Sequence, residues 1–416
     1  MVGRRFHTVL APLLALSMAA AAWAQFLPTQ PATAPASRPT SQPASAGADW
    51  PMFRGCPTQT GVAGSPLPDE LTVCWSYDLK AGSACTPAVV GGTVYISTDS
   101  GKLAALDLAR GTVKWQFDGP EAIASSPTVI RAPAPGLVVF GDEAGTLRAC
   151  DAATGVVRWS FEAGDRIVSS VNTAGAEPGR YQSADGCLVF GSYDGFVYAL
   201  NSADGSLRWK YDVQERVHGT PAIADGFVLA AGCDGKLHVI RLDDGAAIRQ
   251  VPLGSVSGSA VAVRGDRVFL GLYGEAVIGI DWQAGRVLWR FEDADRPFPF
   301  LSSAAITDDL VLIGGRDRRL RALDPATGRQ RWALVMKGRV DSSPVVAGAR
   351  VFVGAADGVL YAADLATGRE VWRFEAGGGI AGSPAVGEGC LVIVTERGMV
   401  YCFGPRDCTA STPTER

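Results

Sequence analysis

The stretch "ALDPATGRQRW" spans residues 322–332, and forty residues later the chain reads "AADLATGREVW" at residues 362–372. Both copies place a Gly four residues after an Asp and a Trp eight residues after it. The same spacing occurs at Asp107/Gly111/Trp115, Asp151/Gly155/Trp159, Asp281/Gly285/Trp289 and, with Asn in first place, Asn201/Gly205/Trp209. A pattern that returns at so regular an interval indicates a repeat architecture.

Two further positions complete the series. Arg241, Gly245 and Arg249 form a degenerate copy, and an isolated Trp75 precedes the first full copy. The Trp-equivalent residues are then Trp75, Trp115, Trp159, Trp209, Arg249, Trp289, Trp332 and Trp372, separated by 40 to 50 residues.

One period contains four short strands. In the seventh copy they are "SPVVAG", "RVFVGA", "GVLYAAD" and "REVWRF", separated by the turn sequences "AADG" and "DLATGR". Four antiparallel strands per unit of about 40 residues are typical of a propeller blade. The fold class is therefore all-β, an eight-bladed β-propeller with four-stranded antiparallel blades.

The order of the strands predicts how the ring closes. Eight segments resemble a first strand and eight positions mark a fourth strand, but the chain starts with a fourth strand, at Trp75, and ends with a third. The N-terminal strand should therefore complete the last blade, which removes an exposed sheet edge. The Trp side chains should pack one blade on the next. Arg249 predicts a looser contact at its seam.

The ends of the chain indicate export. Residues 1–24 have a basic start, a short apolar run and the ending "AWA", as in a cleaved signal peptide. Arg4 and Arg5 leave both the general and the twin-arginine routes open. Residues 25–48 form a Pro/Ala/Ser/Thr-rich linker that we expect to be disordered. Residues 49–71 form a lead-in segment, residues 72–405 the propeller and residues 406–416 a tail.

Composition excludes several chemistries. A formal charge of −4 does not suit a general nucleic-acid binder, and no stretch of the mature chain is apolar enough to span a membrane. Nine cysteines occur without a CxxC, and only three histidines are present, so we expect no metal site. We interpret pairs such as Asp194-Gly195 and Asp234-Gly235 as hairpin turns rather than calcium ligands, and His218 and His238 as structural.

The repeat resembles that of the PQQ-like, quinoprotein-type propellers. The resemblance rests on "YAADLATGREVWRF" with its preceding "SP" and "ADG", and it covers residues 49–405. The lead-in "DWPMFRGCPTQTGV" also resembles the start of secreted bacterial members. The family implies either quinone-dependent dehydrogenases or non-enzymatic assembly factors similar to BamB. The dehydrogenases resemble one another in an adjacent Cys-Cys pair, which this chain lacks.

Three functions remain open. The first is a non-enzymatic scaffold without a cofactor, similar to BamB, exported to the periplasm or outer envelope or secreted, monomeric, and binding other envelope proteins. The second is a PQQ-dependent oxidoreductase, and the third is a sensor that binds a small anionic ligand at the channel mouth. Because one fold hosts many activities, the site must decide among them.

Four arginines are candidates for binding an anion or an acidic partner. Arg166, Arg216 and Arg339 each lie five residues before the start of a first strand, and Arg296 lies in a similar but longer loop. These loops lead to the innermost strands, so the guanidinium groups could surround the channel mouth. The alternative is local pairing with neighbouring acids such as Asp165, Glu215 and Asp295.

Two cysteines are candidates for a disulfide at the ring closure. In the first hairpin, a four-residue turn would place Ala105 opposite Lys114, the residue before the Trp. The same register places Cys402 opposite Cys74, and cross-strand neighbours lie ~4.5–5.5 Å apart. A bond closing so long a loop would contribute about 4–5 kcal/mol in the chain-entropy account.

Overall fold

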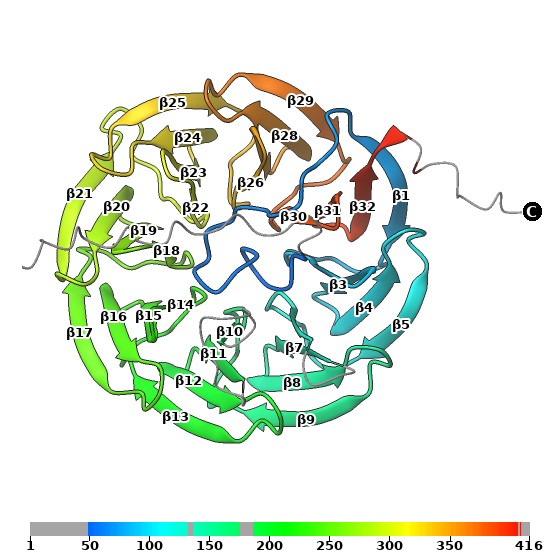
Figure 1. Cartoon of the computed structure of the whole chain (residues 1–416), viewed down its shortest axis with the longest axis horizontal. Coiled ribbons are helices and arrows are strands. Elements are labelled where there is room, and N and C mark those ends of the chain that lie inside the picture. The colour runs from blue at the N-terminus through cyan, green and yellow to red at the C-terminus, as the bar shows by residue number, and fades with distance from the viewer. Residues whose placement is uncertain (1–48, 132–135, 175–185, 407, 409–416) are drawn as a thin grey trace, which may run out of the picture. The chain divides into compact units, whose positions relative to one another are not determined.

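The computed structural model describes residues 49–131, 136–174, 186–406 and 408. The predicted signal peptide, the linker and most of the tail lie outside these residues. Within the unit Pro43–Arg416, eight four-stranded sheets are arranged around a common central axis (Figure 1), and we call the region along this axis the channel. In the described ranges, no helix has the length and apolar character that crossing a membrane requires. The all-β, eight-bladed prediction is confirmed.

The first four blades follow one another along the chain. Blade 1 contains β2 (Ala88–Val90), β3 (Thr93–Ser97), β4 (Lys102–Asp107) and β5 (Val113–Asp118). Blade 2 contains β6 (Thr128–Ile130), β7 (Leu137–Gly141), β8 (Thr146–Asp151) and β9 (Val157–Glu162). Blade 3 contains β10 (Asn172–Ala174), β11 (Cys187–Gly191), β12 (Phe196–Asn201) and β13 (Leu207–Asp212). Blade 4 contains β14 (Ala222–Ala224), β15 (Phe227–Ala231), β16 (Lys236–Arg241) and β17 (Ala247–Pro252).

The next three blades repeat this order, and the eighth borrows a strand. Blade 5 contains β18 (Ala262–Arg264), β19 (Arg267–Gly271), β20 (Ala276–Asp281) and β21 (Arg286–Glu292). Blade 6 contains β22 (Ala305–Ile306), β23 (Val311–Gly315), β24 (Arg319–Leu323) and β25 (Gln330–Val335). Blade 7 contains β26 (Val345–Ala347), β27 (Arg350–Gly354), β28 (Val359–Asp364) and β29 (Glu370–Glu375). Blade 8 contains β30 (Ala385–Gly387), β31 (Cys390–Val394), β32 (Met399–Gly404) and β1 (Thr72–Asp78).

The ring closes as the strand order predicts. β1 is the outermost strand of blade 8 and pairs antiparallel with β32, so the two ends of the propeller form one sheet (Figure 1). Apolar clusters join neighbouring blades; one of them combines Leu229 and Val239 of blade 4 with Val268 and Ile278 of blade 5. The core therefore lies between the blades, which makes each blade depend on its neighbours.

The repeated Trp and Gly meet at these seams. The indole nitrogen of Trp115 donates to the carbonyl of Ala152 in the next hairpin, at 3.0 Å, and its ring covers Gly155. At the degenerate seam, Arg249 donates to the carbonyl of Gln283 and its side chain covers Gly285. We expected a looser contact at this seam. The hydrogen bond to the next blade is nevertheless kept, with the Arg249 guanidinium in place of an indole N–H.

The aspartates of the Asp-Gly turns bind side chains of their own blades. Asp194 accepts a hydrogen bond from Tyr198 at 2.6 Å, and Asp357 accepts one from Tyr361 at 2.7 Å. His238 occupies the equivalent place in blade 4, where its Nε2 lies 3.0 Å from Asp234. These aspartates therefore bind the third strand of their own blade, which agrees with the hairpin interpretation.

The predicted disulfide partner is wrong. Cys74 is bonded to Cys408, 334 residues later, and Cys402 is a free, buried thiol. A β-bulge between Val73 and Trp75 places Trp75, and not Cys74, opposite Cys402. The first hairpin has the same bulge, with Ala105 opposite Trp115. The extra residue shifts the register by one, and Cys74 therefore meets the tail beyond β32.

Two glycines of blade 7 allow the energetic cost of backbone strain to be measured apart from the cost of a steric clash. Gly368 has a φ of +71°, and a Cβ added there would lie 2.5 Å from the Trp332 ring. Gly348 has a φ of +60°, with no atom within 4 Å of such a Cβ. We expect Gly348→Ala to cost about 1–2 kcal/mol. Gly368→Ala should cost about 1–3 kcal/mol more, because Trp332 must move. If urea unfolding gave the same loss of free energy for Gly348→Ala and Gly368→Ala, the packing of Trp332 on Gly368 would be contradicted.

Candidate functional site

One end of the channel is bordered by a side chain from each blade, in the turn between its second and third strands. These residues are Asp99, Glu143, Tyr193, Cys233, Tyr273, Arg316, Ala356 and Glu396. The backbone N–H of each donates to a carbonyl in the loop that enters the same blade; Tyr193, for example, donates to Arg166 at 3.0 Å. We call this end the channel mouth. The loops with the predicted arginines lie here.

The structure brings two of those arginines together. The guanidinium carbon of Arg166 lies 4.5 Å from the centre of the Tyr193 ring, and that of Arg216 lies 5.5 Å from it. The Tyr193 hydroxyl lies 2.6 Å from Nδ1 of His218. We call Arg166, Tyr193, Arg216 and His218 the mouth cluster. Cation–π contact of this kind fixes the guanidinium planes while leaving their N–H groups able to bind.

The mouth cluster has a surplus of positive charge. Burial lowers the pKa of His218, and the nearby Arg166 lowers it further, so the imidazole is neutral at pH 7. Burial raises the pKa of Tyr193, so the phenol is neutral as well. Arg166 is 42% exposed and forms one ion pair, with Glu143 at 3.2 Å. Arg216 is exposed and takes part in none of the ion pairs found among the described residues. Such a site suits carboxylates.

The other two predicted arginines do not join the mouth cluster. Arg339 and Arg316 share Asp341, at 2.9 and 2.8 Å. Arg296 does not occupy the position equivalent to Arg166, and this part of the prediction is wrong. The carbonyl of Pro299 stands there and accepts the N–H of Arg316. The extra residues of the loop move Arg296 onto its exposed tip.

The channel mouth is electrically uneven. Asp99, Glu143 and Glu396 come from the adjacent blades 8, 1 and 2. The corresponding residues of blades 3 to 6 are aromatic, thiol or basic, ending at Arg316. One part of the mouth is therefore acidic and the part around the mouth cluster is basic, an asymmetry that would orient a charged partner.

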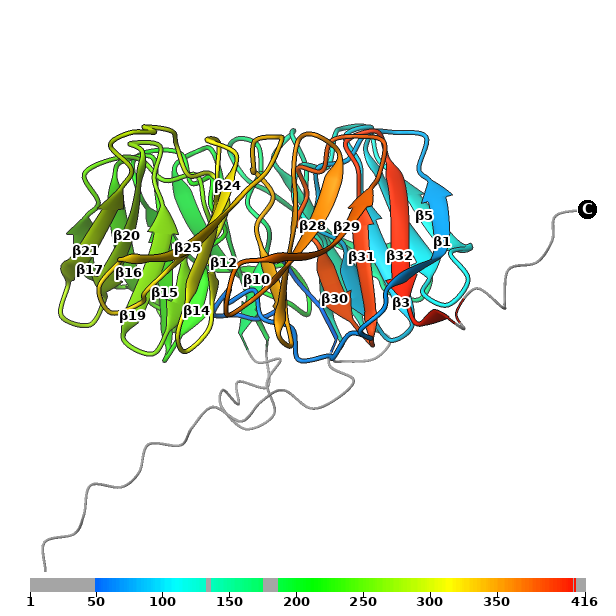
Figure 2. The same cartoon turned by 90° about the horizontal axis from the view of Figure 1, so that it is seen from above.

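The opposite end of the channel is covered by the lead-in segment, which the sequence had indicated only through a family resemblance. The segment crosses the ring on the face seen in Figure 1 and lies toward the lower face in Figure 2. Its backbone exchanges hydrogen bonds with Val89 of β2 and accepts from Val129 of β6 and Ile223 of β14. Further contacts follow at Asn172, Val263, Ile306, Val346 and Gly389, so that all eight blades are reached. We call residues 49–65 the plug.

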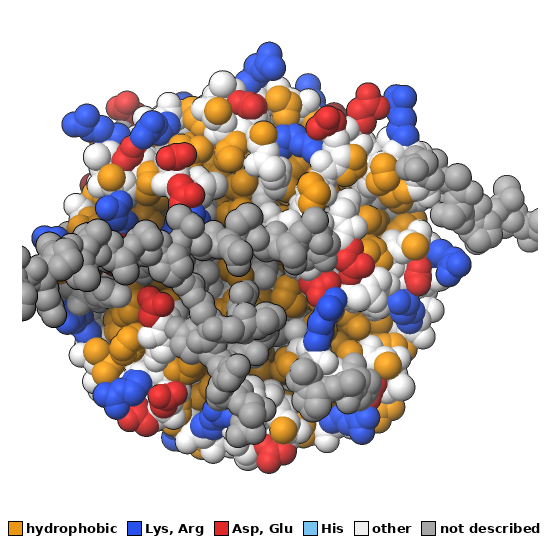
Figure 3. All heavy atoms as spheres, viewed as in Figure 1, with side chains coloured by type: hydrophobic (Ala, Val, Ile, Leu, Met, Phe, Trp, Pro, Cys, Tyr) orange, Lys and Arg blue, Asp and Glu red, His pale blue; other side chains and the backbone are white. Residues whose placement is uncertain are grey.

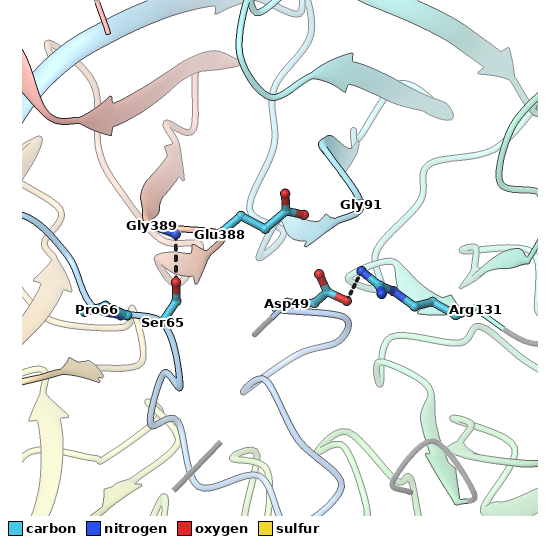
Figure 4. Close-up of a pocket in the computed structure, with 7 residues that line it drawn as sticks. All are labelled: Asp49, Ser65, Pro66, Gly91, Arg131, Glu388 and Gly389. Atoms are coloured by element: carbon cyan, nitrogen blue, oxygen red, sulfur yellow. Dashed lines mark hydrogen bonds and ion pairs between the residues drawn. The ribbon is translucent and has the colours of Figure 1, made fainter. Parts of the chain in front are cut away.

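A pocket of about 500 Å³ lies where the plug meets blades 1, 2 and 8 (Figure 4). Asp49 forms an ion pair with Arg131, and both carboxylate oxygens of Glu388 accept the N–H of Gly92. Burial raises the pKa of Asp49, although Arg131 opposes this. On the visible parts of this face, acidic and basic side chains are interspersed (Figure 3). The ion pair of Asp49 with Arg131 thus fixes the start of the plug, and the Glu388 carboxylate is held by a backbone N–H of blade 1.

The chain does not fit a quinone of the dehydrogenase type. Among residues 49–131, 136–174, 186–406 and 408, no group of three or more His, Cys, Asp or Glu could hold a metal ion. No two cysteines are adjacent in the sequence. The plug also crosses one end of the channel axis. We therefore derive no reaction through such a group.

Comparison with known families decides the relationship. The profile described as outer membrane protein assembly factor BamB matches residues 71–166, 160–298 and 292–407. The chain belongs to the BamB family. A search of the curated proteins finds no match. The resemblance inferred from the repeat is confirmed.

Solved structures share the BamB-type ring. BamB from Moraxella catarrhalis is 22% identical, with 81% of this chain and 98% of that chain covered and a TM-score of 0.66. The quinohemoprotein alcohol dehydrogenase from Comamonas testosteroni is 15% identical, with 90% and 83% covered and a TM-score of 0.71. The computationally designed Ika8 protein is 17% identical, with 83% and 99% covered and a TM-score of 0.66. At these identities the likeness shows the fold alone.

Proposed function

We propose that this BamB-family propeller is an exported, non-enzymatic scaffold that binds an acidic segment of another envelope protein at the channel mouth. The mouth cluster carries the proposal, because two guanidinium groups lie against one aromatic ring and, among the described residues, only that of Arg166 forms an ion pair. Arg and Tyr are the residues in which interface binding energy concentrates. The family described as an outer membrane assembly factor supports a location in the envelope.

The plug supports binding at the mouth rather than at the other face. The backbone of the plug already binds inner strands of the ring, so the channel end there is closed by the chain itself. At the mouth, Arg216, Tyr273 and Arg316 are exposed. We expect the protein to act as a monomer with one partner at this face.

Site-specific crosslinking tests the proposal. With a photoreactive residue in place of Tyr273, beside the mouth cluster, the exported protein should crosslink to one envelope protein in intact cells. Arg166→Glu with Arg216→Glu should reduce that crosslink at least tenfold, because two attractive charges become repulsive. Arg331→Glu is the matched control, because Arg331 is an exposed arginine in an outer strand, paired with Asp324.

The outcomes separate the three functions. An undiminished crosslink in the double variant would exclude the mouth cluster as the binding site. Stoichiometric PQQ binding, followed by absorbance, together with dye reduction would replace the scaffold with an oxidoreductase. Binding of a small carboxylate that the double variant loses, without any protein crosslink, would favour a sensor.

A further inference from the structure

The plug carries two polar side chains into the centre of the ring without partners for them. Arg54 is fully buried, and among the described residues its side chain forms one hydrogen bond, from Nη2 to the carbonyl of Ala304 at 2.9 Å. Nε and Nη1 of Arg54 have no partner, and neither amide atom of the buried Gln59 has one. Arg54 takes part in none of the ion pairs among the described residues. An uncompensated buried charge is costly, so its presence requires an explanation.

The local backbone holds the guanidinium in this place. Arg54 and Gln59 have φ values of 62° and 58°, which non-glycine residues seldom adopt. The N–H of Gly61 donates to the carbonyl of Arg54, and a Cβ on Gly61 would lie 1.9 Å from the guanidinium. The positive φ of Arg54 and the missing side chain of Gly61 together let the guanidinium of Arg54 point inward. Backbone strain of this kind is often found at functional sites.

A belt of hydroxyl groups lies deeper in the channel. Its members are Thr86, Ser126, Ser170, Thr220, Ser303, Ser343 and Ser383. Each hydroxyl accepts a backbone N–H from the preceding blade, as in the bond from Thr86 to Ser126 at 2.9 Å. In blade 5 the position holds Ala260, so the belt has one gap.

The belt has unused donors. Among the described residues, none of its seven hydroxyls donates a hydrogen bond. In blades 1, 2, 4, 6 and 7 the belt residue precedes the residue whose backbone N–H binds the plug by three residues, or about 10 Å. The carbonyl that binds Arg54 belongs to Ala304, the residue after Ser303 of the belt. The guanidinium therefore lies on the belt side of the plug, and among the described residues it forms no ion pair with a carboxylate.

We propose that the channel between the plug and the hydroxyl belt binds a small monovalent inorganic anion of the size of chloride. The anion accepts hydrogen bonds from Nε or Nη1 of Arg54, from the Gln59 amide and from belt hydroxyls, and its single negative charge balances the single guanidinium. The site is separate from the mouth cluster and holds whether or not a partner binds there. Binding to the folded chain alone stabilises the ring by mass action.

Bromide tests this directly in the full exported chain. Crystals soaked in sodium bromide should show an anomalous peak within hydrogen-bonding distance of Arg54. In solution, chloride should raise the melting temperature by about 2–4 °C for each tenfold increase above its Kd. Sodium gluconate at equal ionic strength, whose anion is too large for the site, should not. Arg54→Met should abolish the chloride effect, whereas Arg216→Met at the mouth should retain it.

Each outcome decides the matter. Ordered water on Nε and Nη1 in place of bromide would overturn the proposal, as would a chloride effect that persists in Arg54→Met. A sulfate at Arg54 without any halide would overturn the monovalent class. If Arg54→Met does not fold, Arg54→Lys, which keeps the charge but loses two donors, should bind bromide more weakly, and unchanged binding would count against the site.

Discussion

Replacing Cys74 or Cys408 with serine should lower the free energy of unfolding by roughly 2–5 kcal/mol, the usual cost of losing a native disulfide. The bond joins residues 334 positions apart, so it restricts nearly the whole unfolded chain. It also fastens β1, the one outer strand that no short turn connects to its neighbour. Chemical unfolding of the oxidised protein measures this cost, and the two single variants should lose the same amount.

Cys402→Ala is the control for this experiment. Cys402 is buried and free, and it lies opposite Trp75 in the same strand pair. In Cys402→Ala, non-reducing peptide mapping should still find the disulfide-linked Cys74–Cys408 peptide. The loss of unfolding free energy in this variant should not match the loss caused by reducing the disulfide. A Cys74–Cys402 peptide in the wild-type protein would refute the pairing described above.

Replacing Arg321 with methionine should cost about 3–5 kcal/mol, because it removes one partner of a buried ion pair. Arg321 is fully buried, and its guanidinium donates to Asp317 at 2.5 and 2.9 Å and to Asp293 at 2.6 Å. The group also lies 5.5 Å from the centre of the Phe300 ring. Without it, the one ion-pair partner left to the buried Asp317 among the described residues is Arg319, at 3.7 Å. Urea unfolding gives the difference.

Arg331→Met provides the matched comparison within blade 6. Arg331 is paired with Asp324, but its side chain is more than half exposed, so its loss should cost under about 1 kcal/mol. Adding Asp317→Asn to Arg321→Met should restore part of the stability, because it removes the charge left unpaired. Equal costs for Arg321→Met and Arg331→Met would show that the buried pair contributes no more than a surface one.

The candidate site was predictable from sequence only in part. The positions of Arg166, Arg216 and Arg339 followed from counting back from the first strands, since their carbonyls accept equivalent hydrogen bonds in three blades. The partners of Arg166 did not follow, because Tyr193 and Glu143 come from turns of two different blades. Arg296 was misplaced because the length of its loop does not reveal which residue reaches the axis.

The sequence by itself determined those features that depend on residues close together in the chain. Turn residues and strand spacing define each hairpin within a few residues, so the eight blades, the four strands of each and the closing strand at Trp75 could be counted. The tertiary structure alone decided three further features. A one-residue bulge redirected Cys74 to Cys408, the non-repetitive plug contacted all eight blades, and Arg54 bound the carbonyl of Ala304. The disulfide and the Arg54 contact join residues 334 and 250 positions apart, and only the closed ring brings them together.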